Sequence, residues 1–273
     1  MSAFKLGEVR PPTAADFAYF RSMARDDTGW KKHHGKKRCR VFTRSTDVTS
    51  FKMIKVVANN PKVPAQVLYD TLHDNSYRPI WDKTMKESYG ICRVSPDSVI
   101  EYYGLKSPFT FANRDFVLYR AWRIEGDEYI IFNRSVFHKK VPPKAGFVRA
   151  LTYLTGYVIT STGPNSCELI YITQTDPRGD IPAWALNLAT TKWAPSLLKG
   201  FFKAACNYPA WKATHDPNDR LWYITDRDPG NLPMVQMGDI LKEPDYARSK
   251  VVENVNEVEA TQEAAHYSED EEI

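Results

Sequence analysis

The 273-residue sequence has no apolar run approaching the roughly 18 residues of a membrane-spanning helix, which excludes an integral helical membrane protein. Its first residues, MSAFK, contain no apolar stretch typical of a secretory signal. No glycine follows Met1, so an N-myristoylation site is also missing. We therefore expect a cytoplasmic protein.

Cysteine is scarce and scattered. The four cysteines are Cys39, Cys92, Cys167 and Cys206, and no two of them form a C-x-x-C pair. This spacing excludes a small disulfide-framed fold and offers no zinc site. We interpret all four as reduced thiols that pack as small hydrophobic side chains.

Motifs of catalysis are missing as well. The sequence contains no G-x-x-x-x-G-K or G-x-G-x-x-G phosphate loop, no G-x-S-x-G nucleophile elbow and no H-E-x-x-H. Asp70 and His73 are three residues apart, and we interpret them as a pair on a helix surface because no third metal ligand is implied. The sequon Asn133-Arg134-Ser135 lies in a predicted strand and is read as incidental. We predict that the protein is not an enzyme and holds no metal or cofactor.

Aromatic residues are abundant, at 13% of the chain, within an otherwise ordinary composition of 42% hydrophobic and 26% charged residues. Charge is divided along the chain. Residues 216–273 carry 15 acidic and 5 basic side chains, whereas residues 1–215 carry 18 acidic and 32 basic ones. A basic body with an acidic tail indicates an anionic partner, with nucleic acid and lipid headgroups both candidates.

The N-terminal part predicts a helix followed by strands. Thr13 can cap a helix with Asp16 three positions later, and Phe17 and Phe20 follow at helical spacing. We expect strands at 40–43 and 51–57, a helix at 65–73 and a short helical turn at 77–82. Residues 31–38 hold five basic side chains and two histidines, which we read as a solvated turn or, alternatively, a patch that contacts phosphates.

Nearly a hundred residues of β-structure follow, with hairpin turns at 125–127 and 163–166. The strands are expected at 99–104, 116–124, 129–132, 148–160 and 167–175. Successive hairpins predict an antiparallel sheet with one face free to cover something apolar. The elements together predict an α+β fold.

A helix over residues 182–208 is the last organised element. It is unusually aromatic, with Trp184, Leu188 and Phe201 in its apolar arc. Pro195 should kink or loosen the middle of this helix, because proline removes a backbone hydrogen bond. We interpret the helix as a lid. The acidic segment 216–273 is predicted to be largely disordered.

Arg78 and Asp82 are four residues apart and can meet on one face of a helical turn. At the surface such a pair contributes almost nothing, whereas a buried pair costs desolvation and needs a reason. The sequence leaves both alternatives open. A buried arginine beside a cavity would offer its guanidinium to a phosphate.

These residues belong to a set of motifs in a specific order. The motifs are Tyr77-Arg78-x-x-Trp81-Asp82, Pro108-Phe109, Asn113-Arg114-Asp115, Gly156-Tyr157, Ser161-Thr162-Gly163-Pro164 and Asp176-Pro177-x-Gly179-x-Ile181-Pro182-x-Trp184. Together they resemble the START (StAR-related lipid-transfer) family, and within it the phosphatidylcholine-transfer subgroup. The resemblance implies a helix-grip fold, in which a curved antiparallel sheet wraps around a long C-terminal helix and encloses a lipid tunnel. It covers a lipid-binding domain at 13–215.

The resemblance also implies roles for single residues. Arg78 matches the residue that binds the lipid phosphate, and Asp82 the residue that orients it. Tyr103, Phe116 and Tyr153 fall where aromatic side chains surround the choline ammonium, an arrangement that attracts cations. The alternative for each aromatic is an ordinary place in the sheet core.

Two positions depart from the phosphatidylcholine carrier. Leu72 and Thr155 stand where that carrier has a tyrosine and a glutamine near the phosphate. The headgroup therefore stays open between choline and ethanolamine.

We expect a monomeric intracellular carrier of phosphatidylcholine or phosphatidylethanolamine that contacts membranes transiently and binds no nucleic acid. A lipid sensor or scaffold with a regulatory tail is the first alternative, and a helix-grip enzyme the second. Ser268 with Glu269, Asp270 and Glu271 after it matches a site for an acidophilic kinase. Phosphorylation there would add negative charge and weaken attraction to anionic membranes.

Overall fold

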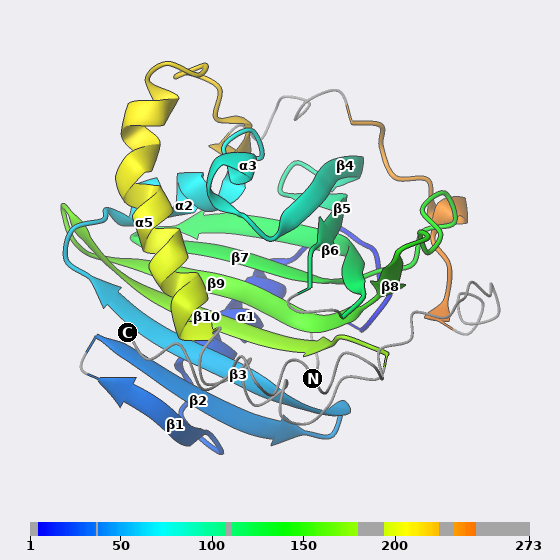
Figure 1. Cartoon of the computed structure of the whole chain (residues 1–273), viewed down its shortest axis with the longest axis horizontal. Coiled ribbons are helices and arrows are strands. Elements are labelled where there is room, and N and C mark those ends of the chain that lie inside the picture. Colours follow the sequence, from blue (N-terminus) through cyan, green and yellow to red (C-terminus); the bar gives the residue numbers. More distant parts are fainter. Residues whose placement is uncertain (1–4, 37, 108–110, 180–193, 224–231, 244–273) are drawn as a thin grey trace.

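One large antiparallel sheet forms the centre of the protein (Figure 1). The computed structural model describes residues 5–36, 38–107, 111–179, 194–223 and 232–243. Within these residues the sheet has ten strands, nine of them in the order β1-β2-β3-β10-β9-β7-β6-β5-β4. The tenth, β8, pairs with β6 in parallel. The last strand, β10, therefore joins the N-terminal strands to the rest of the sheet.

The strands are β1 Lys31–Lys36, β2 Cys39–Thr46, β3 Thr49–Asn60, β4 Met85–Ser95, β5 Ser98–Leu105, β6 Asn113–Glu125, β7 Glu128–Ser135, β8 Phe147–Arg149, β9 Leu151–Gly163 and β10 Ser166–Asp176. The helices are α1 Ala14–Arg25, α2 Ala65–His73, α3 Arg78–Trp81 and α5 Ala194–Lys212, with 3-10 turns η2 Leu221–Tyr223 and η3 Met237–Asp239. The predicted α+β class is confirmed, and α2 coincides with the helix predicted at 65–73.

The α1 face of the sheet is the side on which α1 packs. Phe17 and Phe20 of α1 are buried against Phe132 of β7, and the ring centroids of Phe17 and Phe132 are 5.2 Å apart. Gly156 of β9 lies beneath Phe20. A Cβ atom at Gly156 would come within 2.7 Å of the Phe20 ring and 2.3 Å of the Ile131 carbonyl oxygen. Glycine is therefore required for α1 to approach the sheet this closely.

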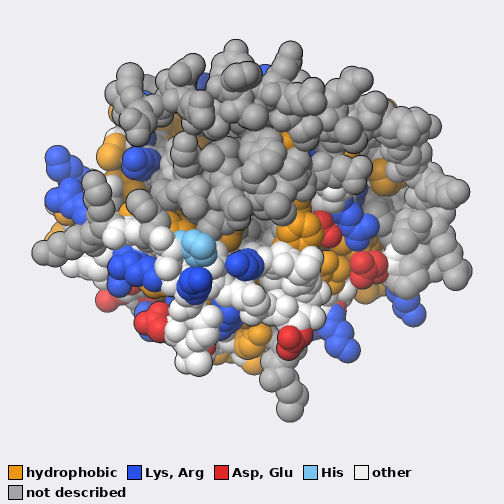
Figure 2. Space-filling model, turned by 60° about the horizontal axis from the view of Figure 1, so that its bottom comes forward, with side chains coloured by type: hydrophobic (Ala, Val, Ile, Leu, Met, Phe, Trp, Pro, Cys, Tyr) orange, Lys and Arg blue, Asp and Glu red, His pale blue; other side chains and the backbone are white. Residues whose placement is uncertain are grey.

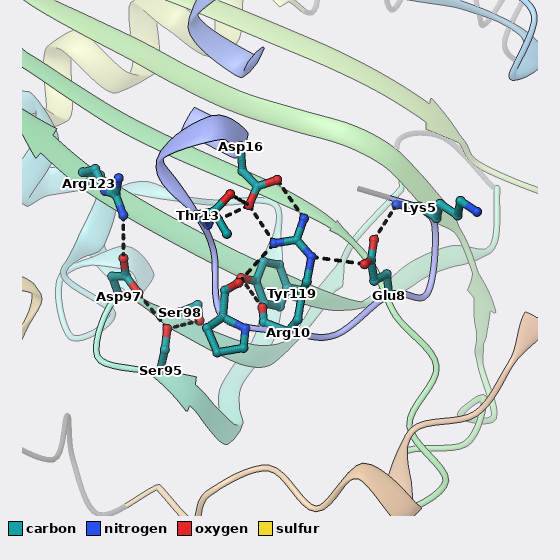
Figure 3. A network of polar contacts seen from close by, with 11 residues as sticks. Lys5, Glu8, Arg10, Thr13, Asp16, Ser95, Asp97, Ser98, Tyr119 and Arg123 are labelled. Atoms are coloured by element: carbon teal, nitrogen blue, oxygen red, sulfur yellow. Dashed lines mark hydrogen bonds and ion pairs between the residues drawn. The ribbon is translucent and has the colours of Figure 1, made fainter. Parts of the chain in front are cut away.

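A polar network fixes the start of α1 (Figure 3). The Asp16 carboxylate accepts hydrogen bonds from the backbone N–H of Thr13 at 2.7 Å and from its hydroxyl at 2.8 Å. Arg10 donates to both Asp16 oxygens, at 2.7 and 2.8 Å, and its own carbonyl oxygen accepts from the Tyr119 hydroxyl at 3.0 Å. The predicted cap is confirmed, and it ties the N-terminal segment to β6.

The α5 face is the opposite side of the sheet, on which α2 and α5 pack (Figure 1). Its core includes Leu68, Tyr69 and Leu72 of α2, Leu198, Phe201 and Ala205 of α5, and Ile131, Tyr157 and Ile159 of the sheet. Side chains alternate between the two faces along each strand. Phe132 lies on the α1 face, so its neighbours Ile131 and Asn133 point to the α5 face.

The basic segment 31–38 differs from its predicted solvated turn. Lys31–Lys36 forms β1, an antiparallel edge strand paired with β2. Figure 2 turns this lower edge of the sheet toward the viewer and shows Lys and Arg side chains gathered there around a histidine. Lysine-rich edge strands carry no apolar alternation, and their charges discourage pairing with other chains. The prediction missed β1 for this reason.

The packed unit extends past position 215, where the sequence predicted a domain boundary. The indole N–H of Trp222 donates to Asp70 Oδ1 of α2 at 2.8 Å. Further along, the backbone N–H of Val235 donates to the Arg93 carbonyl of β4 at 2.7 Å. Parts of the predicted tail therefore pack on the domain, while residues 244–273, with Ser268, lie outside the described residues.

The described part of the C-terminal helix, α5, ends at Lys212, four residues beyond the predicted end. Pro195 is the second residue of the described part of α5. Residues 180–193, including Trp184 and Leu188, lie outside the described residues, so the break at Pro195 stays a prediction. No helix in the described ranges is long and apolar enough to cross a bilayer.

Candidate functional site

Arg78 and Asp82 lie together where the chain turns from α2 into β4. Asp74 fixes this turn, because its Oδ1 accepts a hydrogen bond from the backbone N–H of Tyr77 at 3.1 Å. The spacing along α3 brings Arg78 Nη1 to 3.7 Å from Asp82 Oδ2. The two side chains are only 16% and 11% exposed. Of the two alternatives left open by the sequence, the structure shows the largely buried pair.

The hydrogen-bonding capacity of Asp82 is largely used, whereas that of Arg78 is not. Asp82 accepts from the Tyr103 hydroxyl at 2.7 Å and from the Thr84 hydroxyl at 2.8 Å. The Arg78 guanidinium makes a loose ion pair with Asp82 and donates no hydrogen bond to any described residue. A guanidinium group has five N–H donors. Most of these donors are available to an anionic ligand.

Arg78 keeps its positive charge in this environment. Burial lowers the pKa of the Arg78 guanidinium, but its electrostatic interactions with Tyr103, Tyr157, Asp82 and Glu101 together outweigh burial and raise that pKa. Burial also raises the pKa of Tyr103, so its hydroxyl stays protonated and can donate to Asp82. The site presents a permanent cation beside one satisfied carboxylate.

Two of the three predicted aromatic residues lie beside each other. Tyr103 of β5 and Phe116 of β6 are cross-strand partners and pack together. The guanidinium carbon of Arg78 lies 5.3 Å from the Tyr103 ring centroid and 5.4 Å from that of Trp81. The structure thus brings Arg78, Asp82, Tyr103 and Phe116 into one region.

The other predicted residues lie farther along the α5 face or at its edge. Leu72 is buried in α2, and Thr155 of β9 donates its hydroxyl to the Ile172 carbonyl at 3.2 Å. Tyr153 stands at a register irregularity between β9 and β10 and is partly exposed. The predicted lid residue Phe201 is buried edge-on against Trp81, with ring centroids 5.5 Å apart.

A second buried ion pair lies on the same face and was missed from the sequence. Arg120 of β6 donates to the Leu72 carbonyl at 2.9 Å, and its Nη1 lies 3.6 Å from Glu101 Oε1 of β5. These two side chains are 9% and 13% exposed. Alternation along β6 places Arg120 on the face of Phe116, so the pattern could have identified it.

His73 and Asp70 are both buried, so their interpretation as a helix-surface pair is wrong. His73 lies between two indoles, with its ring centroid 5.3 Å from that of Trp122 and 5.6 Å from that of Trp222. Burial, together with the positive charge of Arg120, lowers the pKa of His73 well below its usual value. Its Nε2 atom has no hydrogen-bond partner in the part of the chain that the structure describes.

The described residues contain no cluster of His, Cys, Asp or Glu that could hold a metal ion. The four cysteines are free, and Cys206 is exposed on α5, unlike the packed thiol expected. A hollow of about 360 Å³ lies beside α1 on the opposite side of the sheet, with Lys32, Lys55 and Glu168 in its lining. None of the predicted lipid-binding residues lines it.

Known proteins are similar to this chain in sequence and in fold. The START domain family model matches residues 13–212. START domain-containing protein 10 from Mus musculus is 34% identical over 255 residues, which cover 93% of this chain and 86% of that protein. The phosphatidylcholine transfer protein from Rattus norvegicus is 30% identical over 173 residues, covering 62% and 78%. The crystal structure of human STARD10 matches with a TM-score of 0.79 at 35% identity, covering 85% of this chain and 94% of that one. The predicted resemblance and helix-grip fold are confirmed, and the chain belongs to the START domain family.

Proposed function

We propose that this protein binds one glycerophospholipid on the α5 face of its sheet and transfers it between membranes. The observation that carries the proposal is the buried Arg78, held beside Asp82 with unused N–H donors. The planar guanidinium group matches phosphate oxygens in geometry and charge. A relative named for phosphatidylcholine transfer supports the assignment.

The aromatic residues next to Arg78 suit an ammonium headgroup. Tyr103 and Phe116 lie together beside the guanidinium, so a phosphate on Arg78 would bring its headgroup close to their rings. Aromatic faces attract such cations by about 0.5–2 kcal/mol each. We assign phosphatidylcholine and phosphatidylethanolamine as the ligands. Thr155, Leu72 and Tyr153 complete the proposed lining.

Lipid transfer requires a protein that covers the acyl chains. Two chains carry about 30 methylene groups, and their exposure to water would cost about 24 kcal/mol at ~0.8 kcal/mol each. A carrier removes this cost, but one of its elements must open at the membrane. We assign this role to α5 and the residues before it, including Trp184, Leu188 and Pro195. The contact of Phe201 with Trp81 supports it, because α5 covers the side chains next to Arg78.

The test is native mass spectrometry of the full chain purified from cells, combined with transfer between donor and acceptor vesicles. Arg78→Leu should weaken phospholipid binding about 10–100-fold, since hydrogen bonds to a charged group contribute about 1.5–3 kcal/mol. Arg25→Leu is the matched control, because Arg25 is exposed and pairs with Glu128 on the surface.

Each competing function predicts a different result. A lipid sensor would bind phospholipid without transferring it, and an enzyme would release a modified product. Equal phospholipid loading of the wild type and Arg78→Leu would contradict the proposal.

A further inference from the structure

Asn133 is a buried amide in the middle of the sheet. It lies on β7 and is 5% exposed. Its neighbour Ile131 belongs to the core of the α5 face, whereas Phe132 packs on Phe17 of the α1 face. Asn133 therefore points to the α5 face, the side that carries the candidate lipid site. This burial agrees with the interpretation of its sequon as incidental.

The cross-strand neighbours of Asn133 already use their donors. In register, Asn133 pairs with Arg120 of β6 and Thr155 of β9. Arg120 donates to the Leu72 carbonyl and pairs with Glu101. The single hydroxyl hydrogen of Thr155 goes to a backbone carbonyl. Asn133 Oδ1 is left buried without a hydrogen-bond partner among the described residues.

A buried carbonyl oxygen without a partner is costly and rare in folded proteins. It needs an N–H or O–H group from something other than the protein. Polar atoms on α2 face the same region. Tyr69 Oη and His73 Nε2 are also buried without partners, and both groups interact electrostatically with Arg120. This region of the α5 face therefore suits a ligand group that can form hydrogen bonds.

This polar region adjoins the proposed phosphate site. Glu101 pairs with Arg120 and also interacts electrostatically with Arg78. Tyr157, two positions from Thr155 on β9, interacts with both arginines. From a phosphate bound to Arg78, the headgroup can extend along the α5 face either to the Tyr103 and Phe116 rings or along β6 toward Asn133.

We propose that Asn133 is a specificity-determining residue whose Oδ1 accepts a hydrogen bond from the headgroup ammonium, which favours phosphatidylethanolamine over phosphatidylcholine. This inference rests on the proposed function. Ethanolamine carries three N–H donors, whereas the quaternary ammonium of choline carries none. With choline bound, the Asn133 oxygen stays unpaired.

The test measures how phospholipid binding changes as methyl groups are added to the headgroup nitrogen. The full wild-type chain is offered vesicles with equal amounts of phosphatidylethanolamine, its N-methyl and N,N-dimethyl forms, and phosphatidylcholine, and native mass spectrometry measures the bound ratios. Binding should fall about 10-fold at the last methylation step, the value of about one hydrogen bond. In Asn133→Leu, of similar shape, the last methylation step should have no effect on the bound ratios.

Gln174→Met is the matched control. The Gln174 amide is also buried, but it donates to the Thr46 hydroxyl at 2.7 Å and the Phe51 carbonyl at 2.8 Å. Its loss should lower stability and leave the headgroup ratios unchanged. A wild type without a drop at the last methylation step overturns the role of Asn133, even if Asn133→Leu does not fold. A wild type that loads no phospholipid overturns the proposed function instead.

Discussion

At the scale of single residues, burial determines the pKa of the His73 imidazole. The imidazole is enclosed by Trp122 and Trp222 and repelled by Arg120 when charged, so its pKa lies well below 6.5 in the folded protein. In the unfolded chain the same group takes up a proton near pH 6.5. The contribution to stability is therefore complete above pH 6.5. It is lost as the pH falls from 6.5 toward the folded pKa, by about 1.4 kcal/mol per pH unit.

Replacing the titrating group should remove this dependence. We expect the unfolding free energy of His73→Phe to fall less steeply than that of the wild type between pH 6.5 and 5. Urea unfolding at half-unit pH steps measures the two slopes. His33→Gln, at an exposed position on β1, should keep the wild-type slope. Parallel slopes for wild type and His73→Phe would contradict the role of His73.

Residue predictions from the sequence succeeded where spacing alone decides which side chains meet. Arg78 and Asp82 are four positions apart, and one helical turn brings them together whatever the surroundings. His73 and Asp70 were wrongly predicted to lie on a helix surface, because the element that buries them comes from the far end of the chain. Trp222 covers both, and no local pattern around α2 indicates this contact.

At the scale of elements, Asp74 joins α2 to the C-terminal end of α5. Its Oδ2 accepts from Lys212 Nζ at 2.9 Å and from the Tyr208 hydroxyl at 3.0 Å, while its Oδ1 caps the turn before α3. Lys212 and Asp74 are 6% and 4% exposed. A buried ion pair that loses one partner leaves the other charge uncompensated. The C-terminal end of α5 is thus held against α2 and the turn before α3.

Breaking this pair should destabilise the protein strongly. We expect Asp74→Ala to lower the unfolding free energy by about 3–5 kcal/mol. Adding Lys212→Met should restore part of this loss, because the unpaired ammonium is removed. Denaturant unfolding of the single and double variants measures the coupling. The exposed pair Lys144 and Glu87 is the matched control and should couple by less than about 1 kcal/mol. Additive effects at Asp74 and Lys212 would contradict the anchor.

Helices and strands whose apolar residues recur at a regular spacing were predictable from the sequence, and those without such a spacing were not. The helix at 65–73 and the hairpins around 125–127 and 163–166 follow from apolar spacing and turn residues. Edge strands β1 and β4 were missed, because their sequences show no regular alternation of apolar and polar residues. The packing of residues 233–235 on β4 and of residues 239–241 on residues 137–139 depends on backbone hydrogen bonds, which leave no mark in the sequence.

At the scale of the whole molecule, the excess of basic residues counted in positions 1–215 is visible at one edge of the sheet. The basic residues of the body include Lys31, Lys32 and Arg38, which are exposed on or next to the edge strand β1 (Figure 2). The N-terminal part of α5 contacts β2 and β3, and its Lys199 and Lys203 are exposed as well. We expect this edge of the sheet to approach anionic membranes while α5 opens.

Neutralising this edge should weaken membrane binding. Each lysine near an anionic surface contributes about 1 kcal/mol, so Lys31→Gln/Lys32→Gln should bind phosphatidylserine-containing vesicles about 30-fold more weakly at low salt. Vesicle co-sedimentation measures the affinity. Salt at ~1 M should abolish the difference, because screening then acts over about 3 Å. Lys83→Gln/Lys86→Gln changes the same charge at or beside the opposite edge strand, β4, and should bind nearly as the wild type does. An equal loss in both double variants would mean that net charge alone, and not this edge, attracts the membrane.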